Sequence, residues 1–329
     1  DRLRALPDHA QDRRLTLALL AQAGDETKRG AARLRVTDSE LIRRITALCP
    51  DLARQDLHEG ARARIVKRGA LALGALALML FVILPRMADT LAGLIPPERE
   101  RAFGRAVTAQ IERALGATEL GELHCTAPDG RHALDTLLSR LTGATGPDTA
   151  PQVTVLDHDM VNAFAAPGGQ IVLMRGLLDA VDGPDAVAAV LAHEIGHVRR
   201  RDATRHALRA AGSAGLLSLV MGDFTGGALA VFLGERMLQA SYTREAERQA
   251  DRFALEMLTR AGIDSGGMAD FFEHLTAREK GRPRLPGYLA THPASERRAA
   301  RARRNAAEQD TTRPALSADQ WRALRGICR

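Results

Sequence analysis

An uninterrupted apolar run in the first third of the chain does most to limit how the chain can fold. Residues 69–84 read GALALGALALMLFVIL and include no charged or polar side chain. As a helix, this run would rise about 24 Å, slightly less than the ~30 Å hydrocarbon core of a bilayer, and residues 65–68 could lengthen it. Because the run is apolar on every face, we expect one transmembrane helix over residues 65–88 rather than a buried core helix.

The charges on either side of the run indicate its orientation. Residues 61–68 contain four basic side chains and no acid, whereas residues 86–101 mix both signs. By the positive-inside rule, residues 1–64 form a small cytoplasmic segment, and everything after about residue 90 lies across the membrane. In a bacterium, this predicts a single-pass protein of the inner membrane whose larger part is periplasmic.

The net charge of +6 does not by itself indicate nucleic-acid binding. Only Lys28, Lys67 and Lys280 are lysines, and aromatic residues are scarce, with eight Phe, two Tyr and one Trp. No basic stretch is interleaved with aromatic residues, as a nucleic-acid platform would require. We interpret the basic segment 296–304 as a solvated helix face, and we expect no nucleic-acid partner.

The remaining pattern predicts an α+β fold that is mostly helical, with one small β-sheet. Within the N-terminal segment, Thr37 and Glu40 resemble a capping box that opens a helix to Leu48. A single domain is expected over residues 98–310, followed by a C-terminal tail at 311–329. The elements expected in that domain are helices within 98–142, strands at 152–157 and 170–174, a turn at 167–169, a helix from Gly183, two apolar helical pieces within 208–240 and a charged helix at 241–261.

The three cysteines form no CxxC pair, so a zinc site built from thiolates is not expected. Cys125 and Cys328 lie on the same side of the apolar run. They could be bridged if that side is oxidising, and the sequence leaves this open.

The sequence HEIGH at residues 193–197 carries the chemistry of the chain. On a helix, His193 and His197 share one face, so both imidazoles can bind one zinc ion. Glu194 is then placed to act as a general base on a water molecule at the metal. The preceding VAAVLA is an apolar helical segment, in which two histidines and an acid would be costly to bury without partners.

A catalytic zinc site needs a third protein ligand. Glu247 and Asp251 lie four residues apart in SYTREAERQAD, so they share a helix face: Glu247 could bind the metal, and Asp251 could orient a ligand imidazole. Glu245 is a competing ligand candidate. His292, in YLATHPASERR, could donate a hydrogen bond to an oxyanion, occupy the fourth metal position in a resting state, or be an ordinary loop histidine.

Four segments together resemble the HtpX-like and type I CAAX prenyl protease zinc metallopeptidases, and among them most closely the periplasmic BepA-type members. They are HEIGHVRRRD, SYTREAERQADRFALEML, VNAFAAPGGQIVLMRGLL and THPASERR, and the resemblance covers roughly residues 100–305. It implies a zincin-like domain with an HExxH…ExxxD site that binds one zinc ion per chain. The roles it implies are zinc ligands at His193, His197 and Glu247, a general base at Glu194, an orienting Asp251, an active-site His292, and a substrate-binding edge at Asn162, Ala163, Phe164 and Gly169.

The resemblance implies an endopeptidase that cleaves misfolded or damaged envelope proteins as extended polypeptides. The printed chain leaves no room after Arg329 for the C-terminal repeat domain of BepA-type members, which puts the corresponding partners in doubt. An alternative is a chaperone-like envelope factor that binds zinc but rarely cleaves, and a third interpretation is a membrane scaffold with a chance HEIGH. The sequence does not indicate an oligomeric state.

Overall fold

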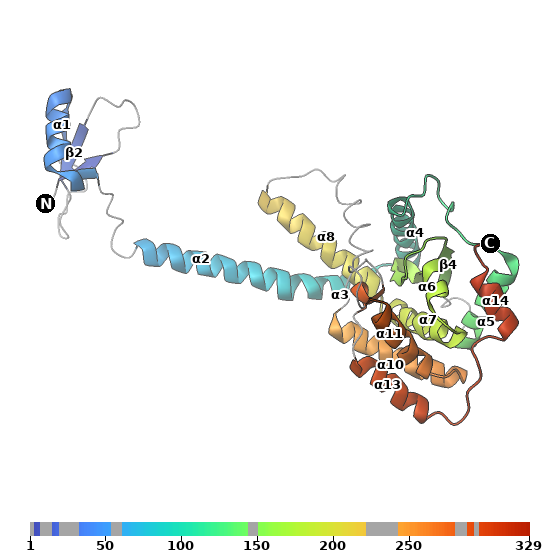
Figure 1. Cartoon of the computed structure of the whole chain (residues 1–329). Helices are drawn as coiled ribbons and strands as arrows, with labels where there is room; N and C mark the ends of the chain where they lie inside the picture. Colours follow the sequence, from blue (N-terminus) through green and yellow to red (C-terminus); the bar gives the residue numbers. More distant parts are fainter. Residues whose placement is uncertain are drawn as a thin grey trace. The chain divides into compact units, whose positions relative to one another are not determined.

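The chain divides into two compact units, Asp1–Leu76 and Ala77–Arg329 (Figure 1). The structure is a computed structural model, and it describes residues 3–6, 15–19, 33–53, 61–143, 151–221, 243–279, 288–292 and 296–329. Residues 222–240, part of the segment in which two apolar helical pieces are expected, lie outside the described residues. The described residues are mostly helical with small sheets, which confirms the predicted fold class.

The first unit contains a small sheet that the sequence did not reveal. Its three antiparallel strands are β1 (Leu3–Leu6), β2 (Leu15–Leu19) and β3 (Arg33–Val36), followed by α1 (Ser39–Leu48) and η1 (Pro50–Ala53). The predicted capping box is wrong by one residue. Asp38 is the N-cap, and its carboxylate accepts hydrogen bonds from the backbone N–H groups of Glu40 and Leu41 at 2.9 and 3.0 Å.

A continuous helical stretch follows the first sheet. It consists of α2 (Ala61–Leu78), the π-helical turn η2 (Met79–Ile83) and α3 (Leu84–Leu94). Among the described residues, only Arg64–Leu94 is long and apolar enough to cross a membrane, with a mean hydropathy of 2.2 in its apolar window, none of which is buried. The helix therefore extends past the expected end at residue 88. Its last helix, α3, buries Ala88 and Ala92 and packs along α8.

The second unit places a three-stranded sheet beside a set of helices. The strands are β4 (Gln152–Leu156), β5 (Ala163–Ala166) and β6 (Gln170–Met174), with β6 in the middle, parallel to β4 and antiparallel to β5. The turn predicted at Pro167–Gly169 joins β5 to β6 as η4. The helices are α4 (Pro97–Ala114), α5 (Pro128–Thr142), α6 (Arg175–Ala180), α7 (Pro184–Arg199), α8 (Asp202–Met221), α10 (Arg244–Ala261), α11 (Gly266–Glu279), α12 (Tyr288–Thr291), α13 (Glu296–Ala307) and α14 (Ala318–Arg325).

Helix α7 runs through the core of this unit. Every residue from Ala186 to His197 is buried, and the helix packs against β5, α10 and α11. Gly196 permits the close approach of α10, because a Cβ atom there would lie 3.1 Å from the Cα of Ala250. The HEIGH sequence therefore sits in an interior where side-chain positions are fixed by packing.

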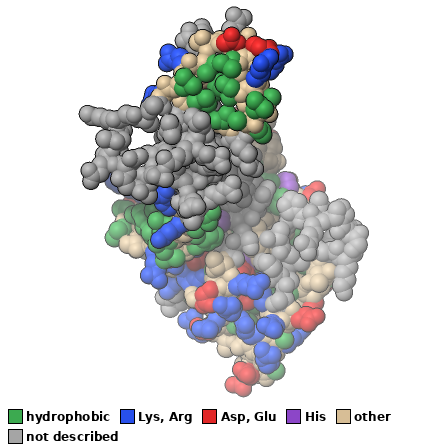
Figure 2. Space-filling view, turned by 90° about the vertical axis from the view of Figure 1, so that its left-hand side faces the viewer, with side chains coloured by type: hydrophobic (Ala, Val, Ile, Leu, Met, Phe, Trp, Pro, Cys, Tyr) green, Lys and Arg blue, Asp and Glu red, His purple; other side chains and the backbone are tan. Residues whose placement is uncertain are grey.

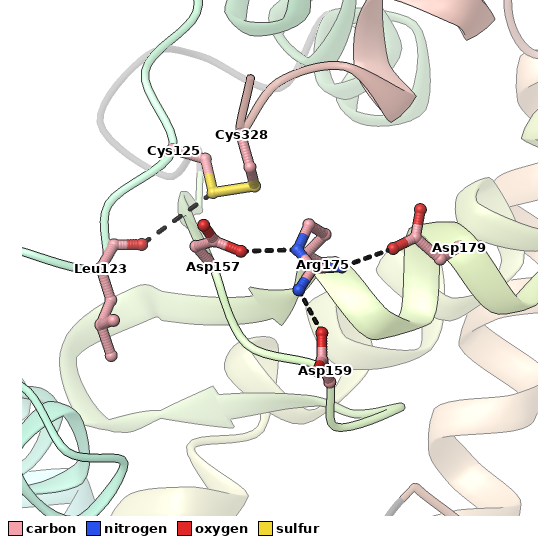
Figure 3. The surroundings of a disulfide bond; sticks show 7 residues. All are labelled: Leu123, Cys125, Asp157, Asp159, Arg175, Asp179 and Cys328. Atoms are coloured by element: carbon pink, nitrogen blue, oxygen red, sulfur yellow. Dashed lines mark hydrogen bonds and ion pairs between the residues drawn. A yellow bond between two sulfur atoms is a disulfide. The ribbon is translucent and has the colours of Figure 1, made fainter.

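The residues expected as a C-terminal tail instead belong to the second unit. Helix α14 packs on α5, and Leu324 and Ile327 are buried in the main hydrophobic core. Cys328 forms a disulfide with Cys125, with the two Cα atoms 4.4 Å apart. Figure 3 shows this bridge next to a cluster in which Arg175 contacts three aspartates, Asp157, Asp159 and Asp179.

Charges of both signs mix on the part of the second unit that carries α10 and α13, which is lowest in Figures 1 and 2. Within the basic segment 296–304, Arg303 pairs with Asp270 and Glu273, while Arg298 turns inward. The segment is thus only partly the solvated face that the sequence predicted. The absence of a nucleic-acid partner stays a prediction.

Candidate metal centre

Four side chains that are distant in the sequence meet at one buried point of the second unit. His193 and His197 come from α7, Glu247 from the first turn of α10, and His292 from the residue after α12. One nitrogen or oxygen of each lies within 4.8 Å of the others, and all four residues are buried. The structure therefore brings together the three expected metal ligands and the expected active-site histidine.

The separations are those of atoms that face a common centre. His193 Nε2 lies 3.1 Å from His197 Nε2 and 3.3 Å from His292 Nδ1. Glu247 Oε1 lies 2.9 Å from His292 Nδ1 and 3.3 Å from His197 Nε2. Imidazole nitrogens with one carboxylate oxygen are a donor set that suits zinc, so the residues fit the metal that the sequence predicts.

Packing against α7 decides which acid of α10 enters the cluster. The helix begins after the N-cap Thr243, whose side chain accepts a hydrogen bond from the N–H of Ala246 at 3.1 Å. Glu247 lies on the buried face of the helix, whereas Glu245, two residues earlier, is exposed and paired with Arg248. Of the two ligand candidates, the structure brings only Glu247 into the cluster.

Each α7 histidine directs its other ring nitrogen to a buried carboxylate. His193 Nδ1 lies 3.1 Å from an oxygen of Asp251, and His197 Nδ1 lies 2.8 Å from an oxygen of Asp202. Such contacts fix the tautomer and leave Nε2 facing the centre. Asp251 was expected in this role. Asp202 was not, although it closes the sequence HEIGHVRRRD that carries both histidines.

Charge pairing holds both aspartates ionised. Burial acts to raise the pKa of Asp251, but the close contact with His193 and the charges of His193 and Arg298 lower it below its usual value. Burial likewise opposes ionisation of Asp202, but the hydrogen bond with His197 and the charges of His197 and Arg200 lower its pKa as well. Two ionised carboxylates are therefore available to orient the two imidazoles.

Glu194 is the group that most needs a partner. It is completely buried, and neither carboxylate oxygen has a hydrogen-bond partner among the described residues. The Nε2 atom of His292 lies 3.5 Å from Glu194 Oε1. A buried carboxylate without a hydrogen bond is costly, and its position beside a metal-ligand cluster gives a reason for keeping it.

Arg298, on α13, is a residue of this site that the sequence did not reveal. It is buried and donates two hydrogen bonds to Asp251, from Nε at 2.9 Å and from Nη2 at 2.7 Å. Its Nη1 lies 2.9 Å from Glu247, and its guanidinium group stacks over Phe272. The one clue in the sequence was that Arg298 follows His292 by only six residues. No other feature of the sequence distinguishes it from the other arginines of 296–304.

Helix α12 holds His292 against the cluster. The rings of His292 and Tyr288 stack with centroids 4.5 Å apart, and the N–H of Tyr288 donates to the carbonyl of Val161 at 2.9 Å. Of the three expectations for His292, the loop histidine does not match this buried position. The geometry places its imidazole among the candidate ligands.

The expected substrate-binding residues lie in β5 or beside its two ends. Ala163 and Phe164 belong to β5, which is buried and which, among the described strands, pairs only with β6. Asn162 immediately precedes the strand and is 1% exposed, with its side-chain amide donating to the sulfur of Met160. Gly169 ends the following turn at φ 82°. All four are near α7, which packs on β5, but none belongs to the metal-ligand cluster.

Comparisons with known proteins agree with this geometry. The profile of peptidase family M48 matches residues 131–306. The chain is 30% identical over 260 residues to the beta-barrel assembly-enhancing protease of Escherichia coli (strain K12), covering 74% of this chain and 53% of that protein. It is also 30% identical over 164 residues to the mitochondrial metalloendopeptidase OMA1 of Schizosaccharomyces pombe, covering 49% of each chain. The chain thus spans about half the length of these curated relatives.

Proposed function

The chain belongs to peptidase family M48, and on that premise we propose that it is a membrane-anchored zinc endopeptidase that cleaves misfolded or damaged envelope proteins. The family makes it a metallopeptidase, an enzyme that hydrolyses peptide bonds. One observation carries the rest of the proposal: His193, His197 and Glu247 converge on one buried point beside the carboxylate of Glu194.

His193, His197 and Glu247 would hold one zinc ion per chain, with Asp251 orienting His193. When bound, the ion would supply a Lewis acid that polarises the scissile carbonyl. Glu194 takes the proton of the attacking water and passes it to the leaving amine. Its position supports this role, because neither carboxylate oxygen has a hydrogen-bond partner among the described residues and both are therefore available to a water molecule at the centre.

His292 has two positions in this proposal. In the resting position it stays beside Glu247, at 2.9 Å, and limits access to the centre. During turnover it withdraws and donates a hydrogen bond to the oxyanion of the tetrahedral intermediate. The resting position is the observation that favours the alternative function, a zinc-binding, chaperone-like envelope factor with little turnover.

The substrate would bind as an extended strand. β5 is an edge strand beside α7, and an edge strand can pair its backbone with an added peptide. Residues 162–169 would line this groove. Envelope proteins are proposed as substrates because one relative is named for β-barrel assembly.

Anchoring and location form the last part of the proposal. Residues 65–88 would cross the bacterial inner membrane once and place the metallopeptidase domain, residues 98–310, in the periplasm, with 1–64 in the cytoplasm. The apolar helix and the basic residues before it support this orientation. The Cys125–Cys328 bridge is compatible with an oxidising compartment.

The test measures zinc content and casein cleavage for the full chain in detergent. We expect one zinc ion per wild-type chain, activity lost by about 10²–10⁴-fold in Glu194→Gln with zinc retained, and zinc lost in Glu247→Ala. Glu245→Gln is the matched control, because this exposed acid on the same helix turn should change neither quantity.

Absence of zinc from the wild-type protein would overturn the metal site. Stoichiometric zinc with equal cleavage by wild type and Glu194→Gln would overturn the role of Glu194. If Glu194→Gln restores a deletion strain as well as wild type does, the chaperone-like alternative replaces the proposal.

A further inference from the structure

The junction between α7 and α8 joins the metal-ligand cluster to another part of the second unit. Helix α7 ends at Arg199 and α8 begins at Asp202, so two residues connect them. Arg201 adopts φ 53°, and among the described residues it is the only non-glycine with a positive φ. This left-handed conformation is unfavourable for a side chain such as arginine, so contacts around the junction must hold it.

The conformation of Arg201 brings Asp202 back toward α7. Asp202 is 7% exposed, and one of its carboxylate oxygens lies 2.8 Å from His197 Nδ1. The same oxygen accepts a hydrogen bond from Arg200. The side chain therefore contacts the ring nitrogen of His197 that faces away from the cluster. An acid in the first turn of a helix can also act only on the helix dipole, but Asp202 makes this further contact.

The side chain of Arg201 reaches in the opposite direction. Its Nη1 donates to the carbonyls of Ala92 at 2.6 Å and Ile95 at 3.2 Å. Both carbonyls are at the C-terminal end of α3, where a helix leaves carbonyl groups without partners in its own backbone. Arg201 thus caps the helical stretch that is proposed to cross the membrane.

A buried acid fixes the guanidinium group in this position. Arg201 Nε lies 3.2 Å from an oxygen of Glu100, in the first turn of α4, which is 5% exposed. Thr204, in the first turn of α8, donates a hydrogen bond to the same carboxylate. The junction is therefore tied to the end of α3 and the start of α4 by partly buried contacts.

We propose that Asp202 is the positioning residue for the metal ligand His197, and that Arg201 secures it by fastening the α7–α8 junction to α3 and α4. A buried carboxylate that accepts the Nδ1 proton fixes the tautomer and aim of the imidazole. The position of His197 then depends on the docking of α3. The inference rests on the proposed function, because it assigns the roles of these residues toward the metal that His197 would bind.

The experiment uses the full chain in detergent, as wild type, Asp202→Asn, Asp202→Glu, Arg201→Asn and Arg199→Asn. Asparagine is nearly isosteric with aspartate, and at position 201 it tolerates a positive φ while removing the guanidinium group. Arg199 is the matched control because it is an exposed neighbour at the end of α7. The readouts are the zinc dissociation constant by chelator competition, the visible absorption of the Co²⁺-loaded protein, and thermal unfolding of the metal-free protein.

We expect Asp202→Asn to weaken zinc binding by about 10- to 100-fold and to shift the Co²⁺ absorption bands. Asp202→Glu should recover part of the affinity because it restores a carboxylate. Arg201→Asn should act in the same direction with a smaller loss, and Arg199→Asn should match wild type.

Wild-type zinc affinity and Co²⁺ absorption in Asp202→Asn would overturn the role of Asp202, even if that variant unfolds at a lower temperature. An Arg201→Asn variant indistinguishable from Arg199→Asn would overturn the role of Arg201. A wild-type chain that binds no zinc would overturn the proposed function together with this inference, and so the two failures are distinguishable.

Discussion

Each of the two candidate metal ligands of α7 is held by a carboxylate, which is in turn held by an arginine, and the two sets of contacts are built differently. Behind His193, Asp251 on α10 is held by Arg298 on α13, so this support is assembled from three helices. Behind His197, Asp202 is held by Arg200, and all three residues lie within six positions of the chain. We call them the distant support and the local support.

The two supports use the same residue types, an aspartate and an arginine, but differ in how deeply the arginine is buried. The Arg298 side chain is 8% exposed and stacks over Phe272, whereas the Arg200 side chain is 23% exposed. A charge deep in the protein loses most of its hydration, so its partner matters more than at the surface. The distant support should therefore hold the domain together, and the local support should mainly set the aim of one ligand.

The largest expected effect tests the distant support. Arg298→Met keeps an unbranched apolar side chain over Phe272 but removes the cation from Glu247 and leaves Asp251 with only the more distant Arg301, at 3.8 Å. Removing one partner of a buried ion pair typically costs about 3–5 kcal/mol. We expect a loss of that size in the free energy of unfolding, measured by urea-induced unfolding of the metal-free protein. A loss below about 1 kcal/mol would contradict the importance given to this support.

The disulfide supplies a reference that touches neither support. It joins two cysteines 203 positions apart, just before the start of α5 and just after the end of α14. Replacing both Cys125 and Cys328 by alanine should lower the free energy of unfolding by about 2–4 kcal/mol. Zinc affinity, measured by chelator competition, should stay at the wild-type level, which would separate loss of stability from loss of ligand orientation. A parallel loss of zinc affinity would show that stability alone controls the site.

A third comparison exchanges the two carboxylates for amides. Asp251→Asn should weaken zinc binding by about 10- to 100-fold, as expected for Asp202→Asn, because each aspartate orients one imidazole. The two variants should differ in stability: Asp251→Asn leaves the buried Arg298 with one carboxylate fewer, while Asp202→Asn affects the less deeply buried Arg200. Zinc titration and thermal unfolding of both metal-free proteins would measure the difference. Equal destabilisation would remove the distinction between the supports.

The sequence predicted the parts of the site that follow helical periodicity. His193, His197, Glu247 and Asp251 lie at i, i+4 spacing on two helices, and this spacing alone puts each pair on one face. The same pattern did not exclude Glu245 as the ligand. The packing of one face of α10 against α7 settled the choice in favour of Glu247, and helical spacing by itself does not show which face is buried.

The remaining site residues depend on turns and long-range packing, which periodicity does not report. Asp202 reaches His197 only because Arg201 takes a left-handed conformation, and nothing about an arginine predicts a positive φ. Arg298 meets Asp251 across 47 positions. Strand β5 reads AFAA, and alanine is uncommon in strands, so the sheet edge was predicted from family resemblance rather than from composition.

The smallest expected effect tests the local support at Arg200. In Arg200→Gln, Asp202 keeps its contact with His197, and water can replace the lost guanidinium because the site is partly open. A partly exposed ion pair contributes about 0–1 kcal/mol, so urea unfolding should detect little change. Zinc affinity should fall less than in Asp202→Asn, because the carboxylate that orients the imidazole remains. If Arg200→Gln destabilised the protein as much as Arg298→Met, burial would not be what distinguishes the two supports, and the extra contacts of Arg200 with Ala246 and Gln249 on α10 would become the explanation.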